Sequence, residues 1–421
     1  MTRTFYTALL YLLVIFTPFK LLWRAKRQPE YLQHWCERYG FYKQLSQKPI
    51  IWLHCVSVGE TRAAAPLVYA LMLQHPNHQI LLTHATPTGR ATAKQLFSGS
   101  VLSVYLPYDL PFAVHRFLAH FKPAIGVLME TELWFNLIAA CKQQQTPLLL
   151  VNARLSEKSA RGYAKLGALV SQGLADLSAI AAQTEEDAAR LKTLGANSVS
   201  VMGNLKFDVS PPIEALEKGE KLRGLIGRHR PVFLAASTRD GEEILILDAV
   251  LKLNITNLLT VIVPRHPQRF DEVEALLNAR NLPYEKRSHL NFETSKLSDT
   301  TQFLLGDSMG ELFTYYAACD VAFIGGSLLP FGGQNLIEAC AVSKPTLVGP
   351  HTFNFTQVAH LAIAHGATKR VQNVDDLAIT VNALLSDLDL RKQMATAALQ
   401  FSQSNQGATA RVAKVIGQFM K

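Results

Sequence analysis

The chain alternates short apolar runs with segments whose apolar residues recur at helical spacing. The apolar runs are continuous, which is typical of strands buried on both faces of a parallel sheet. The expected strands are residues 50–56, 79–84, 103–106, 125–129, 148–151 and 179–182, followed by 232–236, 259–263, 303–305, 321–324 and 346–348. A helical pattern follows most of them, so we predict an α/β protein with parallel sheets covered by helices.

The alternation is interrupted at Asp208–Gly219, a segment that carries two prolines and no strand pattern. A chain of 421 residues is also too long for one ordinary domain. We therefore expect two similar lobes, residues 28–207 and 221–400, joined by a linker at 208–220. The last segment, 401–421, is expected to form a helix that crosses back to the first lobe.

Residues 5–19 are nearly continuous apolar sequence, and the basic cluster RAKR at 24–27 follows them. This order disfavours a cleaved signal peptide, because no small-residue cleavage site follows the apolar run. We predict that residues 1–27 form an uncleaved membrane anchor. It either spans the bilayer, with Lys20 reaching the surface, or lies in the interface. The basic cluster indicates that the rest of the chain stays on the cytoplasmic side.

The chain is basic, with 42 Lys and Arg against 33 Asp and Glu, a net charge of +9. This balance suits an anionic partner such as a phospholipid surface, a phosphorylated substrate or nucleic acid. The five cysteines are scattered and include no CxxC pair, which indicates neither a disulfide framework nor a zinc site.

A glycine-rich stretch lies between the expected strands 321–324 and 346–348. Two glycine pairs precede Asn335, where a helical pattern begins. A glycine loop that leads into a helix N-terminus offers free N–H groups to an anion. Glu338, one turn into that helix, could bond the hydroxyls of a ribose. The spacing from Asn335 equally fits a capping box, in which Glu338 only caps its own helix.

In the first lobe, three charged residues follow predicted strands, where ligands of open parallel sheets bind. Glu60 follows strand 50–56 and could accept a proton, or could only complement a helix dipole. Glu130 follows strand 125–129 together with Glu132, and two carboxylates so close need cations or hydrogen bonds nearby. Lys206 lies at the lobe junction, either in a site or as a solvated linker lysine.

The second lobe has comparable positions. Ser237-Thr238-Arg239 and Arg265-His266-Pro267 each follow a strand, and Arg265 offers a bidentate fork for phosphate or carboxylate. Surface exposure is the simpler explanation for such an arginine. The segment 306–311 (GDSMGE) opens another helix and is a second candidate anion site.

Several motifs are absent from the sequence. No GxxxxGK[ST] is present, which disfavours an ATP-hydrolysing P-loop, and no GxGxxG follows the first strand, which disfavours NAD. HExxH is also absent, so we expect neither a metal site nor a cofactor.

Seven motifs in order along the chain resemble one family. They are HCVSVGE, METELW, NARLSEKS, GNLKFD, PRHPQRF, GDSMGEL and GGQNLIEA. Together they are similar to the 3-deoxy-D-manno-oct-2-ulosonic acid (Kdo) transferases of lipopolysaccharide synthesis, glycosyltransferase family 30. The resemblance implies the GT-B fold: two Rossmann-like domains facing a central cleft, with an N-terminal membrane-anchor helix at the inner membrane. The acceptor would bind the first domain and the activated sugar the second.

The resemblance further implies transfer of Kdo from CMP-Kdo to the lipid A precursor, lipid IVA, with inversion and without nucleic acid as a partner. Glu60 stands where the family has its catalytic base, and Glu130 and Lys206 where it has residues that support the transition state. The CMP-Kdo-binding positions are Arg265, His266, Met309, Gly310, Glu311, Asn335, Leu336, Ile337 and Glu338. Basic residues that could meet acceptor phosphates are Arg62, Arg90, Arg154 and Arg161. The alternatives are a GT-B enzyme with another nucleotide sugar, or a membrane-tethered nucleotide-binding protein without turnover.

Overall fold

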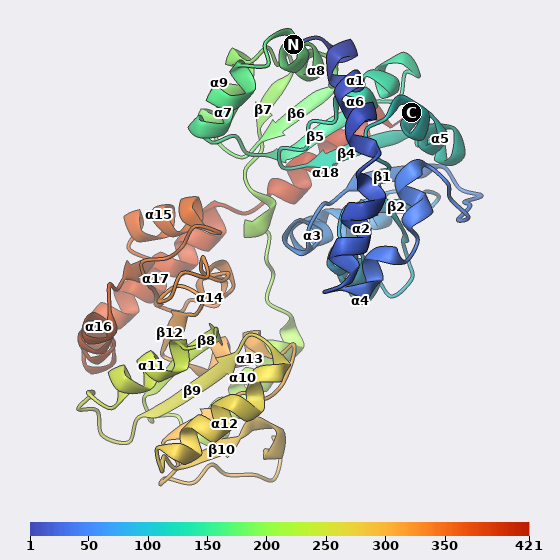
Figure 1. The fold of residues 1–421 in the computed structure, drawn as a ribbon. Coiled ribbons are helices and arrows are strands. Elements are labelled where there is room, and N and C mark those ends of the chain that lie inside the picture. The colour runs from blue at the N-terminus through green and yellow to red at the C-terminus, as the bar shows by residue number, and fades with distance from the viewer. Residues whose placement is uncertain (421) are drawn as a thin grey trace. The chain divides into compact units, whose positions relative to one another are not determined.

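A computed structural model describes residues 1–420 and divides the chain into two compact units. Unit 1 comprises Met1–Asp208 together with the C-terminal residues from Asn405 onward, and unit 2 comprises Val209–Ser404. Each unit contains one seven-stranded parallel sheet with helices around it (Figure 1). Two parallel-sheet, Rossmann-like α/β units are what the alternating pattern predicted.

The sheet of unit 1 has the strand order β3-β2-β1-β4-β5-β6-β7, with every neighbouring pair parallel. Its strands are β1 (Ile50–His54), β2 (Gln79–His84), β3 (Leu102–Tyr105), β4 (Ile125–Met129), β5 (Leu148–Ala153), β6 (Ala179–Ala182) and β7 (Val199–Val201). Successive residues of β1 point to opposite faces, so Trp52 packs in one core and Leu53 in the other. Both faces are covered, which explains the continuous apolar runs.

Helices of unit 1 cover both faces of its sheet. The helices are α1 (Arg3–Val14), α2 (Thr17–Ala25), η1 (Pro29–Leu32), η2 (Trp35–Tyr39), α3 (Val58–Gln74), α4 (Pro87–Phe97), α5 (Pro111–Phe121), α6 (Phe135–Gln143), α7 (Glu157–Ala164), α8 (Ala168–Asp176), α9 (Glu185–Thr193), η3 (Leu205–Phe207) and α18 (Ala408–Phe419). Helices α3, α4 and α18 contribute to the core that contains Leu53. Helices α5, α6, α8 and α9 contribute to the core that contains Trp52.

The N-terminal helix α1 is fastened to unit 1 and lies beside α6 (Figure 1). The Tyr6 hydroxyl donates to Asp109 at 2.9 Å, and the Thr7 hydroxyl donates to Asn136 at 2.9 Å. Within residues 1–420, no single helix is both long and apolar enough to cross a membrane. Helices α1 and α2 would pass only as a pair, and they are bent by 50° at their junction. The expected anchor therefore consists of two short helices, of which α1 packs on the domain.

The sheet of unit 2 has the strand order β10-β11-β9-β8-β12-β13-β14, again parallel throughout. Its strands are β8 (Val232–Thr238), β9 (Leu259–Pro264), β10 (Tyr284–Lys286), β11 (Phe303–Leu305), β12 (Val321–Ile324), β13 (Thr346–Val348) and β14 (Thr368–Arg370). The sequence did not indicate β10 or β14. Both are three-residue edge strands with charged residues, so they lack the apolar pattern of a central strand.

Unit 2 packs helices of widely different length on its sheet. The helices are α10 (Ile213–Ile226), α11 (Glu242–Val250), η4 (Pro267–Arg269), α12 (Phe270–Ala279), η5 (Arg287–His289), α13 (Leu312–Ala318), α14 (Ile337–Ala341), α15 (Thr356–Ala364), α16 (Val374–Ser386) and α17 (Leu388–Ser404). The two helices next to the glycine-rich segments, α13 and α14, have only seven and five residues.

The boundaries between the units differ from the expected ones. The segment predicted as a linker is largely helical, because α10 begins at Ile213 and packs on α13 within unit 2. At the other crossing, α17 ends at Ser404, and α18 contacts α3 of unit 1. The Asp208 carboxylate accepts from the Gly407 N–H at 2.5 Å and also from the Thr409 N–H. The chain thus returns to unit 1 at a point fixed by Asp208.

Candidate active site

Glu60 lies in the first turn of α3, beyond the carboxyl end of β1. The Ser57 hydroxyl caps this helix by accepting a hydrogen bond from the Glu60 N–H at 3.3 Å. The Glu60 carboxylate accepts from the Val56 N–H at 2.8 Å and from the Ser57 hydroxyl at 2.9 Å. Only 8% of Glu60 is exposed. The residue therefore does help to cap its helix, and the same bonds hold its carboxylate in one orientation.

The environment of Glu60 favours its protonated form. Burial, together with the nearby carboxylates Glu130 and Glu132, raises the pKa of this carboxyl to about 7, against the opposing hydrogen bonds from Val56 and Ser57. Glu130 and Glu132 therefore act on Glu60, although they follow a different strand. A carboxylate with a pKa close to the working pH is suited to general-base catalysis. A helix cap alone would not require this shift.

The pH dependence of activity should report this pKa. A base must be ionised, so kcat/KM is expected to rise with pH through about 7 and then to level off. In Glu130→Gln one repulsive charge is lost, so the rising limb should move to lower pH even though the rate falls. Initial rates between pH 5 and 9 would check both. A Glu130→Gln profile with an unshifted limb would contradict the coupling.

Lys206 and Glu130 form an ion pair in unit 1. The Lys206 ammonium lies 3.2 Å from Glu130 Oε1, with both side chains partly buried. Glu130 follows β4 with a φ of +57°, a left-handed conformation that is uncommon for a residue with a side chain. Its N–H donates to the Val151 carbonyl of the neighbouring strand at 2.9 Å. Lys206 is therefore a partly buried, ion-paired residue and not a solvated linker lysine.

Two asparagines fix the segment that carries Lys206. The Asn204 side chain accepts from the Lys206 N–H at 2.9 Å, and the fully buried Asn152 accepts from the Leu205 N–H at 3.0 Å. Because Asn152 belongs to β5, the short helix η3 is tied to the sheet next to Glu130. The structure thus brings Glu60, Glu130 and Lys206 to the carboxyl edge of one sheet.

In unit 2, Arg265 and His266 lie in a cluster of cations after β9. Burial lowers the pKa of the His266 imidazole, and Arg239, Arg265 and Arg269 lower it further. The lowered pKa favours the neutral form of His266. Arg269 already pairs with Asp240, Glu243 and Glu272, so its charge is locally compensated. The arrangement suits an anionic group next to Arg239 and Arg265.

The first glycine pair after β12 does not offer its N–H groups to a ligand. The fully buried Glu242 carboxylate accepts from the N–H groups of Gly326 (2.5 Å), Ser327 (3.0 Å) and Leu328 (2.9 Å). It also accepts from the Arg239 N–H at 2.8 Å. The helix that follows is α14, of only five residues. The part of the expected anion site that used the first glycine pair is therefore wrong, because a protein carboxylate occupies those donors.

The segment from Asn335 to Glu338 divides into two polar and two core residues. Leu336 and Ile337 are buried, so their side chains pack in the core and not against a ligand. The Asn335 side chain donates to Glu338 Oε1 at 3.0 Å and accepts from the Ile337 N–H at 3.1 Å. This pairing joins the two side chains, whereas a capping box would use the backbone N–H of Asn335. Glu338 and Arg265 both act on the pKa of buried Tyr316, so they share one neighbourhood.

Glu338→Ala separates the ribose-binding role from the capping role. If Glu338 bonds the ribose hydroxyls, the variant should bind CMP more weakly by about 1–3 kcal/mol, the usual effect of unmet hydrogen bonds. Calorimetric titration with CMP, together with the melting temperature, would test this. A lower melting temperature with unchanged affinity would support capping alone.

Met309, Gly310 and Glu311 form the loop between β11 and α13. Met309 is 57% exposed, and Gly310 has a φ of +81° that favours glycine. The Glu311 carboxylate accepts from Arg287 at 2.9 Å and from the Ser308 hydroxyl at 2.5 Å. Glu311 therefore stabilises the loop, in which Met309 is exposed. The helix that follows, α13, has only seven residues.

The comparisons with known proteins identify the family of the chain. The family model described as 3-deoxy-D-manno-octulosonic-acid transferase matches residues 33–209, and the model for glycosyl transferases group 1 matches residues 245–401. A 3-deoxy-D-manno-octulosonic acid transferase of Bordetella pertussis is 45% identical over 371 residues, covering 86% of this chain and 85% of that protein. The chain belongs to the Kdo transferase family.

A second Kdo transferase, from Haemophilus influenzae, is 38% identical over 100% of this chain and 99% of its own length. The resemblance carried by the seven motifs is thus confirmed, and the chain is a glycosyltransferase that transfers Kdo. The UDP-GlcNAc 2-epimerase from Neisseria meningitidis bound to UDP-GlcNAc aligns with a TM-score of 0.58, covering 88% of this chain and 100% of that one. At 17% identity, this similarity supports the shared two-domain fold only.

Two residues of this Kdo transferase were not selected from the sequence. The sequence places Arg239 only after β8, whereas the structure places it in the cation cluster around His266. Glu242 was not noted at all, although it organises the glycine loop. The signal was present in the segment STRDGEE, where two acids follow a strand and a glycine. Within residues 1–420, no group of three or more His, Cys, Asp or Glu side chains could hold a metal ion.

Proposed function

We propose that this Kdo transferase moves Kdo from CMP-Kdo to the phosphorylated disaccharide of the lipid A precursor, lipid IVA, with inversion at the anomeric carbon. The observation that carries the proposal is Glu60, a fixed, buried carboxylate whose pKa lies at about 7 beside an ion pair. The names of the relatives supply the sugar. The donor, the acceptor and the stereochemistry are those that the family resemblance implies, and the chemistry of the residues below is compatible with them.

The chemical step is a single displacement. Glu60 accepts the proton of the acceptor hydroxyl while that oxygen forms its bond to the anomeric carbon. The bond between this carbon and the phosphate oxygen breaks, and CMP leaves with the bonding electrons. One base on the face opposite the leaving group gives inversion, by the same logic as in inverting glycosidases. CMP is a monophosphate leaving group, so no metal is needed to bridge a pyrophosphate.

Two negative groups of the donor need positive partners. Kdo carries a carboxylate and CMP departs as a phosphate, and the transition state adds charge to the leaving oxygen. Lys206, held by Glu130, is the cation next to the base. In unit 2, Arg265 and Arg239 lie beside His266. Arg265 and Arg239 are the proposed partners of the donor phosphate.

The acceptor phosphates have fewer candidate partners than the sequence suggested. Arg90 forms an ion pair with the buried Glu37 at 2.7 Å, so its charge is already compensated within unit 1. Arg161 pairs with Glu157 on the surface of α7. We assign the acceptor phosphates to Arg62 and Arg154, which are both exposed. Arg62 lies two residues after Glu60 in α3, and Arg154 lies in the loop between β5 and α7.

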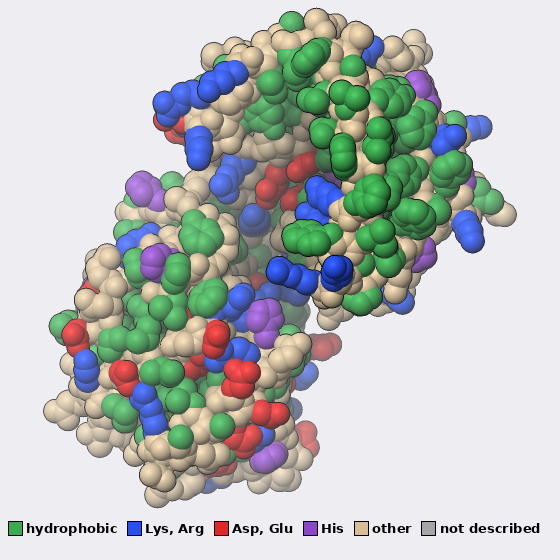
Figure 2. Space-filling view, viewed as in Figure 1, with side chains coloured by type: hydrophobic (Ala, Val, Ile, Leu, Met, Phe, Trp, Pro, Cys, Tyr) green, Lys and Arg blue, Asp and Glu red, His purple; other side chains and the backbone are tan. Residues whose placement is uncertain are grey.

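We place the enzyme at the cytoplasmic face of the inner membrane, held by α1 and α2 lying in the interface. Helix α1 bonds to the domain through Tyr6 and Thr7, which supports an interfacial position over a span. Its other side exposes apolar side chains, and Figure 2 shows hydrophobic residues gathered over α1 and α2. Those that are at least half exposed are Phe5, Leu12, Leu13, Ile15, Phe16, Phe19, Leu22 and Trp23. The basic residues at 24–27 suit an anionic leaflet.

The experiment is transfer by the purified full-length protein. Lipid IVA is offered with CMP-Kdo, and mass spectrometry of the lipid product should show added Kdo. Equal reactions with UDP-sugars test the alternative of a different nucleotide sugar, and NMR of the product tests inversion. Binding of CMP without any product would favour a tethered nucleotide-binding protein and overturn the proposal.

A further inference from the structure

Two cavities lie on either side of the first turns of α1, within unit 1. One has a volume of about 410 Å³ and is enclosed by α1, α5 and α6. The other, of about 490 Å³, is enclosed by α1, α6 and α8. Both volumes are in the range of small-ligand sites, about 300–1,000 Å³. Neither cavity is lined by Glu60, Glu130 or Lys206, so neither belongs to the catalytic centre.

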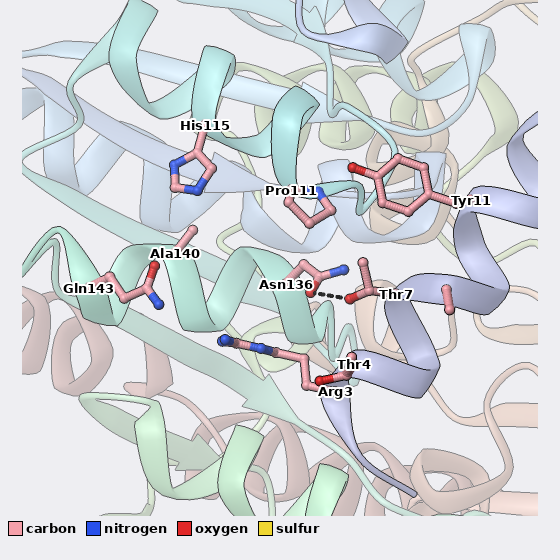
Figure 3. Close-up of a pocket in the computed structure, with 10 residues that line it drawn as sticks. Arg3, Thr4, Thr7, Tyr11, Pro111, His115, Asn136, Ala140 and Gln143 are labelled. Atoms are coloured by element: carbon pink, nitrogen blue, oxygen red, sulfur yellow. Dashed lines mark hydrogen bonds between the residues drawn. The ribbon is translucent and has the colours of Figure 1, made fainter.

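The lining of the first cavity combines cationic and apolar groups. In Figure 3 the Arg3 side chain extends from α1 across α6 toward Gln143, and His115 approaches from α5. Ala8, Tyr11 and the buried Ala140 supply apolar walls. Arg3 also lines the second cavity, together with Lys142, the carboxylate of Asp176, and apolar and amide residues of α6 and α8. The Arg3 guanidinium therefore lines both cavities, and each cavity also has an apolar side.

The cavities are built on a rigid polar network and not on a loose contact. Asn136, on the floor of the first cavity, accepts from Thr7 and donates to the Asp109 carbonyl at 2.7 Å. The buried Asp109 carboxylate accepts hydrogen bonds from the Tyr6 hydroxyl and from the N–H groups of Asn136 and Leu137. Asp109 accepts hydrogen bonds from these three donors, and the nearby charge of Arg3 also favours its ionised form. The Arg3 guanidinium remains at the exposed rim, where it can meet an anion.

The cavities also lie on the helix that we place at the membrane. Thr4, Ala8 and Tyr11 of α1 face the first cavity, while Phe5 and Leu12 on another side of the same helix are more than 60% exposed. A lipid that lies beside α1 in a leaflet would have its phosphate at the level of the polar helix start. Its chain would run along the apolar positions that follow.

We infer that these cavities form a binding site for one anionic glycerophospholipid of the bilayer, distinct from the acceptor. Arg3 binds the phosphate, with Lys142 and His115 at its edges, because a guanidinium forms charge-assisted, bidentate bonds to phosphate. An acyl chain packs on Ala8, Tyr11 and Ala140. The lipid would orient unit 1 on the leaflet more specifically than exposed apolar side chains alone. The inference rests on the proposed interfacial position of α1.

A short-chain lipid tests the site without a membrane. Dihexanoylphosphatidylglycerol, kept below its critical micelle concentration, is titrated into the full-length protein in neutral detergent, with calorimetry as the readout. We expect saturable binding of one lipid per chain. Arg3→Gln and Ala8→Trp should each weaken it about tenfold or more, the first by removing the phosphate partner and the second by filling the cavity. Ala8 is exposed on α1, so its replacement need not disturb the core.

Matched controls separate the cavity from general membrane affinity. Leu12→Trp adds the same ring to the outer side of α1, and Arg24→Gln removes a charge from α2; both should bind the lipid as the wild type does. Absence of binding, or equal loss in all four variants, would overturn the inference. Binding of inorganic phosphate with the same affinity would show an anion site without a lipid role, and would also overturn it.

The outcome is distinguishable from failure of the proposed function. Transfer to detergent-solubilised lipid IVA does not need the cavity, so Ala8→Trp should keep wild-type activity in that assay. If the wild type floats with phosphatidylglycerol vesicles but does not bind the short-chain lipid, the interfacial position stands and the specific site fails.

Discussion

Glu60→Gln is expected to reduce Kdo transfer by about 10²–10⁴-fold, the range typical of a lost general base. The amide keeps the size of the side chain and an oxygen that can accept from the Val56 N–H, so the cap of α3 should persist. It cannot accept the proton of the acceptor hydroxyl. CMP binding should be unchanged, because the residues assigned to CMP lie in unit 2. Initial rates and CMP titration of the purified variant would check both expectations.

The matched control for Glu60 is Glu157→Gln, which removes a carboxylate from the exposed start of α7 in the same unit. This variant should transfer Kdo at the wild-type rate. If Glu60 only caps its helix, Glu60→Gln should lower the melting temperature. Its activity should then fall only in proportion to the folded fraction. Activity within tenfold of the wild type in a folded Glu60→Gln protein would remove the base assignment.

Glu242→Ala should produce the largest loss of stability. The carboxylate serves the N–H groups of Arg239, Gly326, Ser327 and Leu328, and the residue is fully buried. Removing one side of such a buried, charged network typically costs about 3–5 kcal/mol. For a unit of this size, that corresponds to a melting temperature lower by roughly 6–20 °C. Thermal unfolding followed by circular dichroism would measure the change.

Glu242→Ala should also weaken CMP binding, for a reason separate from the loss of stability. Glu242 holds the Arg239 backbone and the glycine loop in register, so the cation next to His266 loses its position. Titration well below the melting temperature would show weaker CMP binding by folded protein. The control is Glu272→Ala, an exposed acid in the same unit that pairs only with Arg269. If Glu242→Ala melts as the wild type does, the loop is held by other contacts.

The positions of Glu60, Glu130 and Lys206 at one edge of the sheet could be predicted from the sequence, because each comes soon after a strand. Glu60, Glu130 and Lys206 lie at strand ends of a parallel sheet, and such ends share one edge. What the sequence could not supply was the electrostatic result. The pKa of Glu60 depends on burial, and on Glu130 and Glu132, which belong to another strand. Likewise, Arg90 was a reasonable phosphate ligand until the fold paired it with Glu37.

The glycine-rich stretch after β12 shows why local pattern was insufficient in unit 2. Glycine pairs before a helical pattern are the local signature of an anion site, and the strand and helix that flank the loop are present. The N–H groups at the start of the loop donate to Glu242, which lies more than eighty residues earlier in the chain. No pattern within the loop contains that information.

By itself the sequence determined the central strands of the two sheets, the order of the two units and the family. Continuous apolar runs admit few folds, and seven motifs in one order are specific. The tertiary structure decided which charges stay available for substrate: it buried Glu242 against the loop, paired Arg90 with Glu37, and fastened α1 to the domain beside two cavities. These outcomes depend on contacts between distant segments, and burial sets both the strength of a charge and its accessibility.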